Sequence, residues 1–162
     1  MTDHPFFDMH RHGFVRVATS TPKVRTADVV YNRDAVVAEA RRAHAAAVDL
    51  VVFPELCLSS YAIDDLHLQE TMIEAVEDAV AYIVEASRGL APVLLIGAAI
   101  PDRGRLYNCG LAIADGKLLG IVPKSYLPNY REFYEKRWFT SGIGVAGRTI
   151  RFAGADVPFG TD

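Results

Sequence analysis

The sequence has few cysteines, no long hydrophobic run and no excess of positive charge. Its two cysteines, Cys57 and Cys109, are too few for a disulfide framework in 162 residues, which favours a reduced cytoplasmic setting. The longest apolar runs, such as residues 93–100, are far shorter than the roughly 20 residues of a membrane-spanning helix. The formal net charge of -3 gives no basic field that would attract nucleic acid. We therefore expect a soluble, cytoplasmic protein that binds neither membranes nor nucleic acid.

The first residues lack the basic start, apolar core and small-residue cleavage site of a secretory signal. Residues 1–13 are mixed in character, and we expect an arm that is poorly ordered or contacts another subunit. His4, His10 and His12 have no ligand of another type clustered with them, so we expect no metal site there. Residues 14–162 are expected to form one domain, because 51% hydrophobic and 23% charged residues are typical of a globular protein.

From residue 14 onward, apolar residues recur with alternating strand and helix periodicity. The pattern predicts, in order, strand, helix, strand, helix and strand over residues 14–18, 34–48, 50–53, 68–87 and 93–98. Asn32 is a good N-cap for the first of these helices. The continuous apolar run at 50–53 is typical of a strand that is buried on both faces.

A hairpin follows these elements. Residues 106–114 and 117–122 have strand character, and the Asp115-Gly116 pair between them favours a type I′ turn. Glycines beyond residue 140 indicate loops and short strands. Alternating strands and helices followed by a hairpin predict an α/β layered domain with a mixed sheet.

Two charged residues occupy matching positions at the ends of predicted strands. Glu55 follows the apolar run that ends in Phe53-Pro54, and Lys124 follows a strand that ends in Pro123. Open α/β sheets bind ligands outside the carboxyl ends of their strands. Taken alone, Glu55 could instead cap a segment or pair with a cation, and Lys124 could be a solvated side chain. Together they indicate a carboxylate beside an ammonium group, which suits proton transfer and oxyanion stabilisation.

The residues around this pair resemble the signatures of the nitrilase, or carbon-nitrogen hydrolase, superfamily. Residues 53–56 followed by Tyr61 resemble the first signature, and residues 106–108, 115–116 and 123–124 resemble the second. The resemblance covers essentially residues 14–160. A narrower likeness, to the glutaminase domain of glutamine-dependent NAD synthetases, rests on residues 58–61, 64–66, 124–130 and 133–137.

The resemblance implies an α-β-β-α sandwich with mixed sheets, incomplete in this chain, and a Glu-Lys-Cys catalytic set. Glu55 would be the general base, and Lys124 would hold the tetrahedral oxyanion. Glu132, eight residues after Lys124, matches a second glutamate that many members place beside the lysine, and we expect a supporting role. Tyr130 matches a tyrosine that lines the glutamine pocket of NAD synthetases. It could equally be an aromatic side chain packed under a loop.

Neither cysteine matches the family's nucleophile. Cys57 and Cys109 are expected to be small core residues, so the nucleophile would lie beyond residue 162. The resemblance implies glutamine as substrate, ammonia passed to a separate synthetase domain that uses ATP and magnesium, and a homo-oligomer. This chain itself has no phosphate-binding Ser-Gly-Gly run and should hold neither cofactor. Two alternatives stay open: a stand-alone ω-amidase or carbamoylase, and a truncated domain without catalytic activity.

Overall fold

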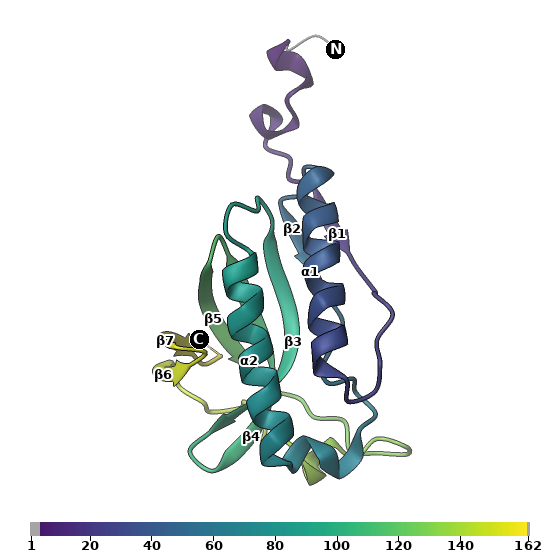
Figure 1. The fold of residues 1–162 in the computed structure, drawn as a ribbon. Helices are drawn as coiled ribbons and strands as arrows, with labels where there is room; N and C mark the ends of the chain where they lie inside the picture. Colours follow the sequence, from purple (N-terminus) through teal and green to yellow (C-terminus); the bar gives the residue numbers. More distant parts are fainter. Residues whose placement is uncertain (1–3, 162) are drawn as a thin grey trace.

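A mixed sheet of seven strands organises the computed structural model, which describes residues 4–161 (Figure 1). The strands are β1 (Val17–Thr19), β2 (Leu50–Val52), β3 (Val93–Asp102), β4 (Arg105–Ala114), β5 (Lys117–Pro123), β6 (Arg148–Phe152) and β7 (Ala155–Phe159). Their order across the sheet is β1-β2-β3-β4-β5-β7-β6. Strands β1, β2 and β3 run parallel, whereas β4 and β5 follow as antiparallel neighbours. The predicted α/β class and mixed sheet are therefore confirmed.

Two long helices, α1 (Val29–Ala45) and α2 (Glu70–Ala86), cover one face of this sheet (Figure 1). The prediction for α2 is correct within two residues, but α1 begins earlier than predicted. Asp28, not Asn32, is its N-cap, because the Asp28 carboxylate accepts a hydrogen bond from the backbone N–H of Tyr31 at 3.1 Å. Asn32 lies inside the helix and is fully buried, where it donates to the Leu58 carbonyl at 2.9 Å.

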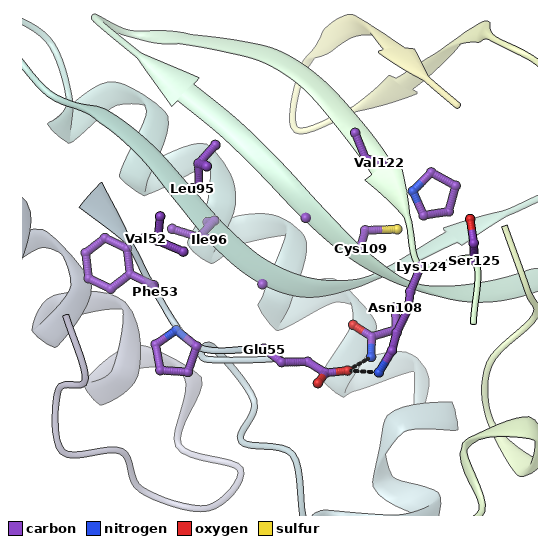
Figure 2. Close-up of a pocket in the computed structure, with 14 residues that line it drawn as sticks. Val52, Phe53, Glu55, Leu95, Ile96, Asn108, Cys109, Val122, Lys124 and Ser125 are labelled. Carbon is purple, nitrogen blue, oxygen red and sulfur yellow. Dashed lines mark hydrogen bonds and ion pairs between the residues drawn. The ribbon is translucent and has the colours of Figure 1, made fainter. Parts of the chain in front are cut away.

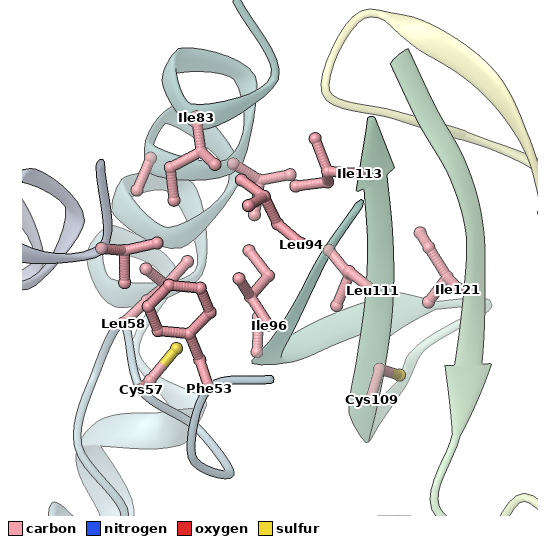
Figure 3. Packing of buried hydrophobic residues seen from close by; sticks show 14 of the residues in the cluster. Phe53, Cys57, Leu58, Ile83, Leu94, Ile96, Cys109, Leu111, Ile113 and Ile121 are labelled. Carbon is pink, nitrogen blue, oxygen red and sulfur yellow. The ribbon is translucent and has the colours of Figure 1, made fainter. Parts of the chain in front are cut away.

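The core lies between the helices and the inward face of the sheet, and alternate strand residues supply it (Figure 3). The register pairs Leu94 with Ile113, Ile96 with Leu111 and Ala98 with Cys109 across β3 and β4. These side chains belong to one hydrophobic cluster with buried residues of α1 and α2, which include Val36, Ala40, Val80 and Ile83. The apolar alternation of the sequence therefore selects one face of the sheet for burial.

The opposite face of the sheet, which we call the open face, is only partly covered in residues 4–161. Val52 and Val122 point to this face and are 37% and 58% exposed. The prediction that residues 50–53 are buried on both sides is therefore wrong, since only Val51 and Phe53 face the core. Near one end, the open face is covered by a second apolar cluster made of Leu56, Ala99, Leu106, Trp138 and Phe139.

The described residues also include four short 3-10 helices: η1 (Pro5–Phe7), η2 (Met9–His12), η3 (Asp64–Leu68) and η4 (Glu135–Arg137). The first two form an N-terminal arm that extends from the top of the domain (Figure 1). The His10 ring attaches this arm, because its Nε2 lies 3.1 Å from both carboxylate oxygens of Asp49. None of the helices within residues 4–161 has the length and apolar character of a membrane span.

Candidate active site

The sheet topology brings Glu55, Asn108 and Lys124 to one edge of the open face. Glu55 follows the carboxyl end of β2, Asn108 lies early in β4, and Lys124 directly follows β5. Cys109 pairs with Pro123, so the preceding and following residues, Asn108 and Lys124, point to the same side. The backbone N–H of Lys124 donates to the Asn108 carbonyl at 2.7 Å, which extends this pairing by one residue.

Strands β2 and β5 are three strand intervals apart, or roughly 14 Å. The segment Pro54–Leu56 closes this gap by crossing over β3 at Gly97. A Cβ atom at Gly97 would lie 2.5 Å from the Leu56 nitrogen and 2.8 Å from the Glu55 Cα, so only glycine permits the crossing. Leu56 adopts a positive φ of 49°, a strained conformation for a non-glycine residue, directly after Glu55.

Lys124 lies between two carboxylates. Its Nζ donates to Glu55 Oε1 at 2.6 Å and to Glu135 Oε1 at 2.9 Å. The Asn108 side-chain amide also donates to Glu55 Oε1, so the same oxygen is fixed from two strands (Figure 2). Among residues 4–161, two of the three ammonium N–H groups of Lys124 have partners, and the third is free to bind a developing negative charge.

The two carboxylates differ in environment. The Glu55 side chain is 41% exposed, whereas the Glu135 side chain is 1% exposed. Tyr61 donates its hydroxyl proton to Glu135 Oε1 at 2.7 Å, and burial, followed by the hydrogen bond and charge of Glu135, raises the pKa of Tyr61. Tyr61 therefore stays protonated as a hydrogen-bond donor. Glu135 Oε2 is buried and has no partner among the described residues.

The pKa of Lys124 reflects opposing influences. Burial lowers it, but hydrogen bonds and charges from Glu55 and Glu135 outweigh burial and raise the Lys124 pKa above its ordinary value. The amine is therefore positively charged near neutral pH. A cation held between two carboxylates provides positive charge for an oxyanion and a base for a proton within one hydrogen-bonded group.

The glutamate at the lysine is Glu135, not Glu132. Glu132 is exposed, and within the described residues Lys124 takes its carboxylate neighbours from Glu55 and Glu135. The spacing of eight residues is misleading because the intervening loop is irregular, with Arg131 at a positive φ of 54°. The expected placement of Glu132 beside Lys124 is therefore wrong, and Glu135 occupies that position.

Tyr130 lies at the rim of the site and is 65% exposed. Its ring meets the Phe133 ring edge to face at 6.2 Å, and Phe133 meets Tyr61 in the same way at 6.4 Å. The aromatic rings therefore form a row from the rim to the hydroxyl that contacts Glu135. The expected role of Tyr130 in binding glutamine stays a prediction.

A cavity of about 460 Å³ opens on the open face beside these groups (Figure 2). Its apolar lining includes Val52, Leu95 and Val122, and its polar end is formed by Glu55, Asn108, Lys124 and Ser125. A substrate carbonyl bound at the polar end would meet the lysine ammonium and the glutamate carboxylate together. No group of three or more histidine, cysteine or acidic side chains in residues 4–161 could hold a metal ion.

Both cysteines are core residues, as predicted from the sequence. Cys57 and Cys109 are 2% and 3% exposed and belong to the main hydrophobic cluster (Figure 3). Burial raises the pKa of Cys57 to about 11, although hydrogen bonds to the backbone partly oppose this, and burial also raises the pKa of Cys109. Neither thiol is therefore a thiolate near neutral pH, and neither suits nucleophilic attack.

Three residues at the site were not assigned from the sequence: Asn108, Tyr61 and Glu135. Asn108 and Tyr61 both fall within the family-like signatures, so the motif contained a signal for them without giving their contacts. Glu135 falls within the residues 133–137 that resemble NAD synthetases, but its approach to Lys124 depends on loop geometry.

Residues 16–160 match the model of the carbon-nitrogen hydrolase family, and the chain therefore belongs to this family. Its sequence is 49% identical over 157 residues to a glutamine-dependent NAD(+) synthetase of Mycobacterium tuberculosis (strain ATCC 25618 / H37Rv), a match that covers 97% of this chain and 23% of that protein. The chain thus spans about a quarter of the length of the curated relatives it matches.

Solved structures agree with this assignment. A glutamine-dependent NAD(+) synthetase from Cytophaga hutchinsonii superposes with a TM-score of 0.83 at 25% identity, covering 90% of this chain and 25% of that chain. An amidase from Nesterenkonia sp. shares the fold, with a TM-score of 0.71 at 20% identity over 89% of this chain and 54% of that chain. The nitrilase-like fold predicted from the sequence is confirmed.

Proposed function

We propose that this chain is the N-terminal part of a glutaminase domain, which releases ammonia from glutamine for the conversion of deamido-NAD to NAD. The observation that carries the proposal is the placement of Lys124 between Glu55 and Glu135 beside a cavity. The likeness to proteins named glutamine-dependent NAD(+) synthetase supports glutamine as the substrate.

The chemistry requires a cysteine thiolate from outside the two buried cysteines of this chain. Glu55 takes the thiol proton, and the thiolate attacks the amide carbon of glutamine. Lys124 stabilises the tetrahedral oxyanion with the N–H group that its two carboxylates leave free. Glu55 then protonates the leaving amine, which departs as ammonia. Finally Glu55 activates a water molecule, which hydrolyses the thioester to glutamate and regenerates the thiol.

The remaining partners belong to the same proposal. The ammonia passes to a synthetase domain that uses ATP and magnesium to activate deamido-NAD, so both cofactors are assigned to that domain and not to these 162 residues. The enzyme acts in the cytoplasm as a homo-oligomer. Tyr130 contributes to the glutamine pocket from its place on the aromatic row.

The test uses the polypeptide that carries these residues, purified with its intact mass measured. We expect Glu55→Gln and Lys124→Ala to abolish glutamine hydrolysis while NAD synthesis from added ammonia continues, because neither residue belongs to the synthetase chemistry. Glu74→Gln and Lys117→Ala, which change exposed residues away from the site, are the matched controls. Loss of ammonia-driven synthesis in a folded Glu55 or Lys124 variant would contradict this division. A wild-type polypeptide that extends beyond these residues, contains a further cysteine and cannot hydrolyse glutamine would contradict the proposed function itself.

A further inference from the structure

Glu135 occupies a segment that has little regular structure of its own. Its only element is η4, a single turn of three residues, and the segment before it is an irregular loop. Yet its side chain is buried and its Oε1 meets both Lys124 and Tyr61 within 3 Å. Such accuracy in an irregular segment requires support from elsewhere in the fold.

The support comes from η3. Asp65 accepts two hydrogen bonds from the Arg137 guanidinium, from Nε and Nη2, each at 2.6 Å. Its Oδ1 also accepts from the Trp138 indole N–H at 2.9 Å, and Asp64 accepts from the Tyr134 hydroxyl at 3.0 Å. We call these five residues the η3–η4 clamp.

Residues of the clamp lie on both sides of Glu135 in the sequence. Tyr134 precedes Glu135 directly, and Arg137 and Trp138 follow it by two and three positions. A guanidinium that binds a carboxylate through two parallel N–H groups fixes orientation as well as distance. The backbone on both sides of Glu135 is therefore tied to η3.

The same part of the chain also reaches the Glu135 carboxylate. Tyr61, three residues before η3, donates to Glu135 Oε1, and the buried ring of His67 lies 3.2 Å from the Tyr61 carbonyl through Nε2. The His67 ring packs against Trp138, with the ring centroids 5.6 Å apart. The same segment, η3 with the residues just before it, therefore holds both the backbone around Glu135 and the Glu135 carboxylate.

Exposed ion pairs usually contribute little to stability, and the Asp65 and Arg137 side chains are 56% and 58% exposed. This pair differs from an isolated one such as Arg151–Asp156, which makes a single 3.3 Å contact at the solvent surface. Asp65 joins elements 72 residues apart and is shared with a tryptophan. The hydrogen bond from Arg137, and then that from Trp138, hold the pKa of Asp65 well below its usual range, so the carboxylate is charged near neutral pH.

We infer that Asp65 is a positioning residue, which places the Glu135 carboxylate against Lys124 through Arg137 and Trp138. The inference rests on the proposed function for its catalytic meaning, because Lys124 is the group that would hold the oxyanion. Its structural content is independent of activity and can be measured in the full polypeptide that carries these residues.

The experiment measures the pKa of Lys124 by competitive acetylation and peptide mass spectrometry. The sequence has four lysines, and Lys23 and Lys117 are internal references. In the wild type, Lys124 is expected to titrate above an ordinary lysine. In Asp65→Asn its pKa should fall by about one pH unit, the order of effect of losing one close opposite charge. Asp156→Asn, the matched control, should leave Lys124 unchanged.

The outcomes separate the inference from the proposed function. A folded Asp65→Asn protein with Lys124 unchanged would overturn the role of Asp65 and leave the proposed function standing. An ordinary pKa for wild-type Lys124 would show that the Glu135–Lys124 ion pair does not form, and both the inference and the proposed function depend on that pair. If Asp65→Asn does not fold, Arg137→Lys decides the question, because it keeps the positive charge but loses the two parallel N–H groups that bind Asp65. A smaller fall in the Lys124 pKa supports the inference, and no change overturns it.

Discussion

At the scale of single residues, one ammonium group is shared by two carboxylates of unequal exposure. Glu55 borders the cavity and can exchange a proton with a ligand, whereas Glu135 is enclosed and fixed by Tyr61. Environments that differ this much usually separate the roles of paired acids. Glu55 is therefore suited to proton transfer, and Glu135 to holding the lysine in place.

The role of Glu135 predicts that substitutions of Glu135 and of the nearby Glu132 will have very different effects on the rate. Glu135→Gln should lower the rate of glutamine hydrolysis by on the order of 10²-fold, because Lys124 loses a partner that aligns it. Glu132→Gln changes an exposed side chain and should alter the rate by no more than about twofold. Steady-state kinetics of both variants test this. Equal losses in the two variants would show that Glu135 has no special place at the site.

The sequence was enough to locate the two site residues at strand ends, but it was not enough to locate the site residue in a loop. Glu55 and Lys124 each follow an apolar strand and a proline, so periodicity and one fold rule locate them. Glu135 depends on a loop whose course is set by contacts such as Asp65–Arg137, 72 residues apart in the sequence. No local pattern records such a contact, and the family resemblance placed the second glutamate at Glu132.

At the scale of elements, local sequence signals predict some helices and strands accurately and others only in part. The helix α2 and the Asp115-Gly116 hairpin follow local signals and were predicted almost to the residue. The start of α1 was misplaced because Asp28 and Asn32 are both good caps, and only the fold shows that Asn32 is needed inside to bind the Leu58 carbonyl.

The crossing of the Pro54–Leu56 segment over β3 makes Gly97 a sensitive position. Gly97→Ala should destabilise the fold by about 1–3 kcal/mol, because the new methyl group meets backbone atoms that cannot move aside. Gly110→Ala is the matched control, since a Cβ there on the adjacent strand meets nothing within 4 Å. Urea unfolding of both variants measures the difference. A Gly97→Ala protein as stable as Gly110→Ala would refute the close approach.

At the scale of the whole molecule, helices cover one face of the sheet and leave apolar side chains on the other. Leu119 and Val122 on β5 are 48% and 58% exposed. Contiguous exposed apolar surface of this kind promotes association. The family resemblance predicted the fold class and an incomplete sandwich, which leaves an apolar face exposed. The local pattern did not show that residues 50–53 border this face, because such a run has the same apolar character whether one or both faces are buried.

A purified polypeptide of residues 1–162 alone is therefore expected to self-associate as its concentration rises. Replacing Leu119 and Val122 together by lysine should reduce this association, because it places charge on the apolar face. Light scattering over a concentration series measures the effect, and changing Lys23 and Lys117 to arginine is a control with unaltered charge. A wild-type polypeptide that stays monomeric at all concentrations would contradict the prediction.

The ion pair of Glu55 and Lys124 also has a consequence for folding kinetics. The two residues are 69 positions apart, and β3 and β4 lie between the strands that carry them. Closing so long a loop costs entropy that is recovered only when the intervening strands have paired. We therefore expect the pair to form late, after the sheet from β2 to β5 has aligned. A chain caught part-way through folding holds the same charged groups but has no assembled site.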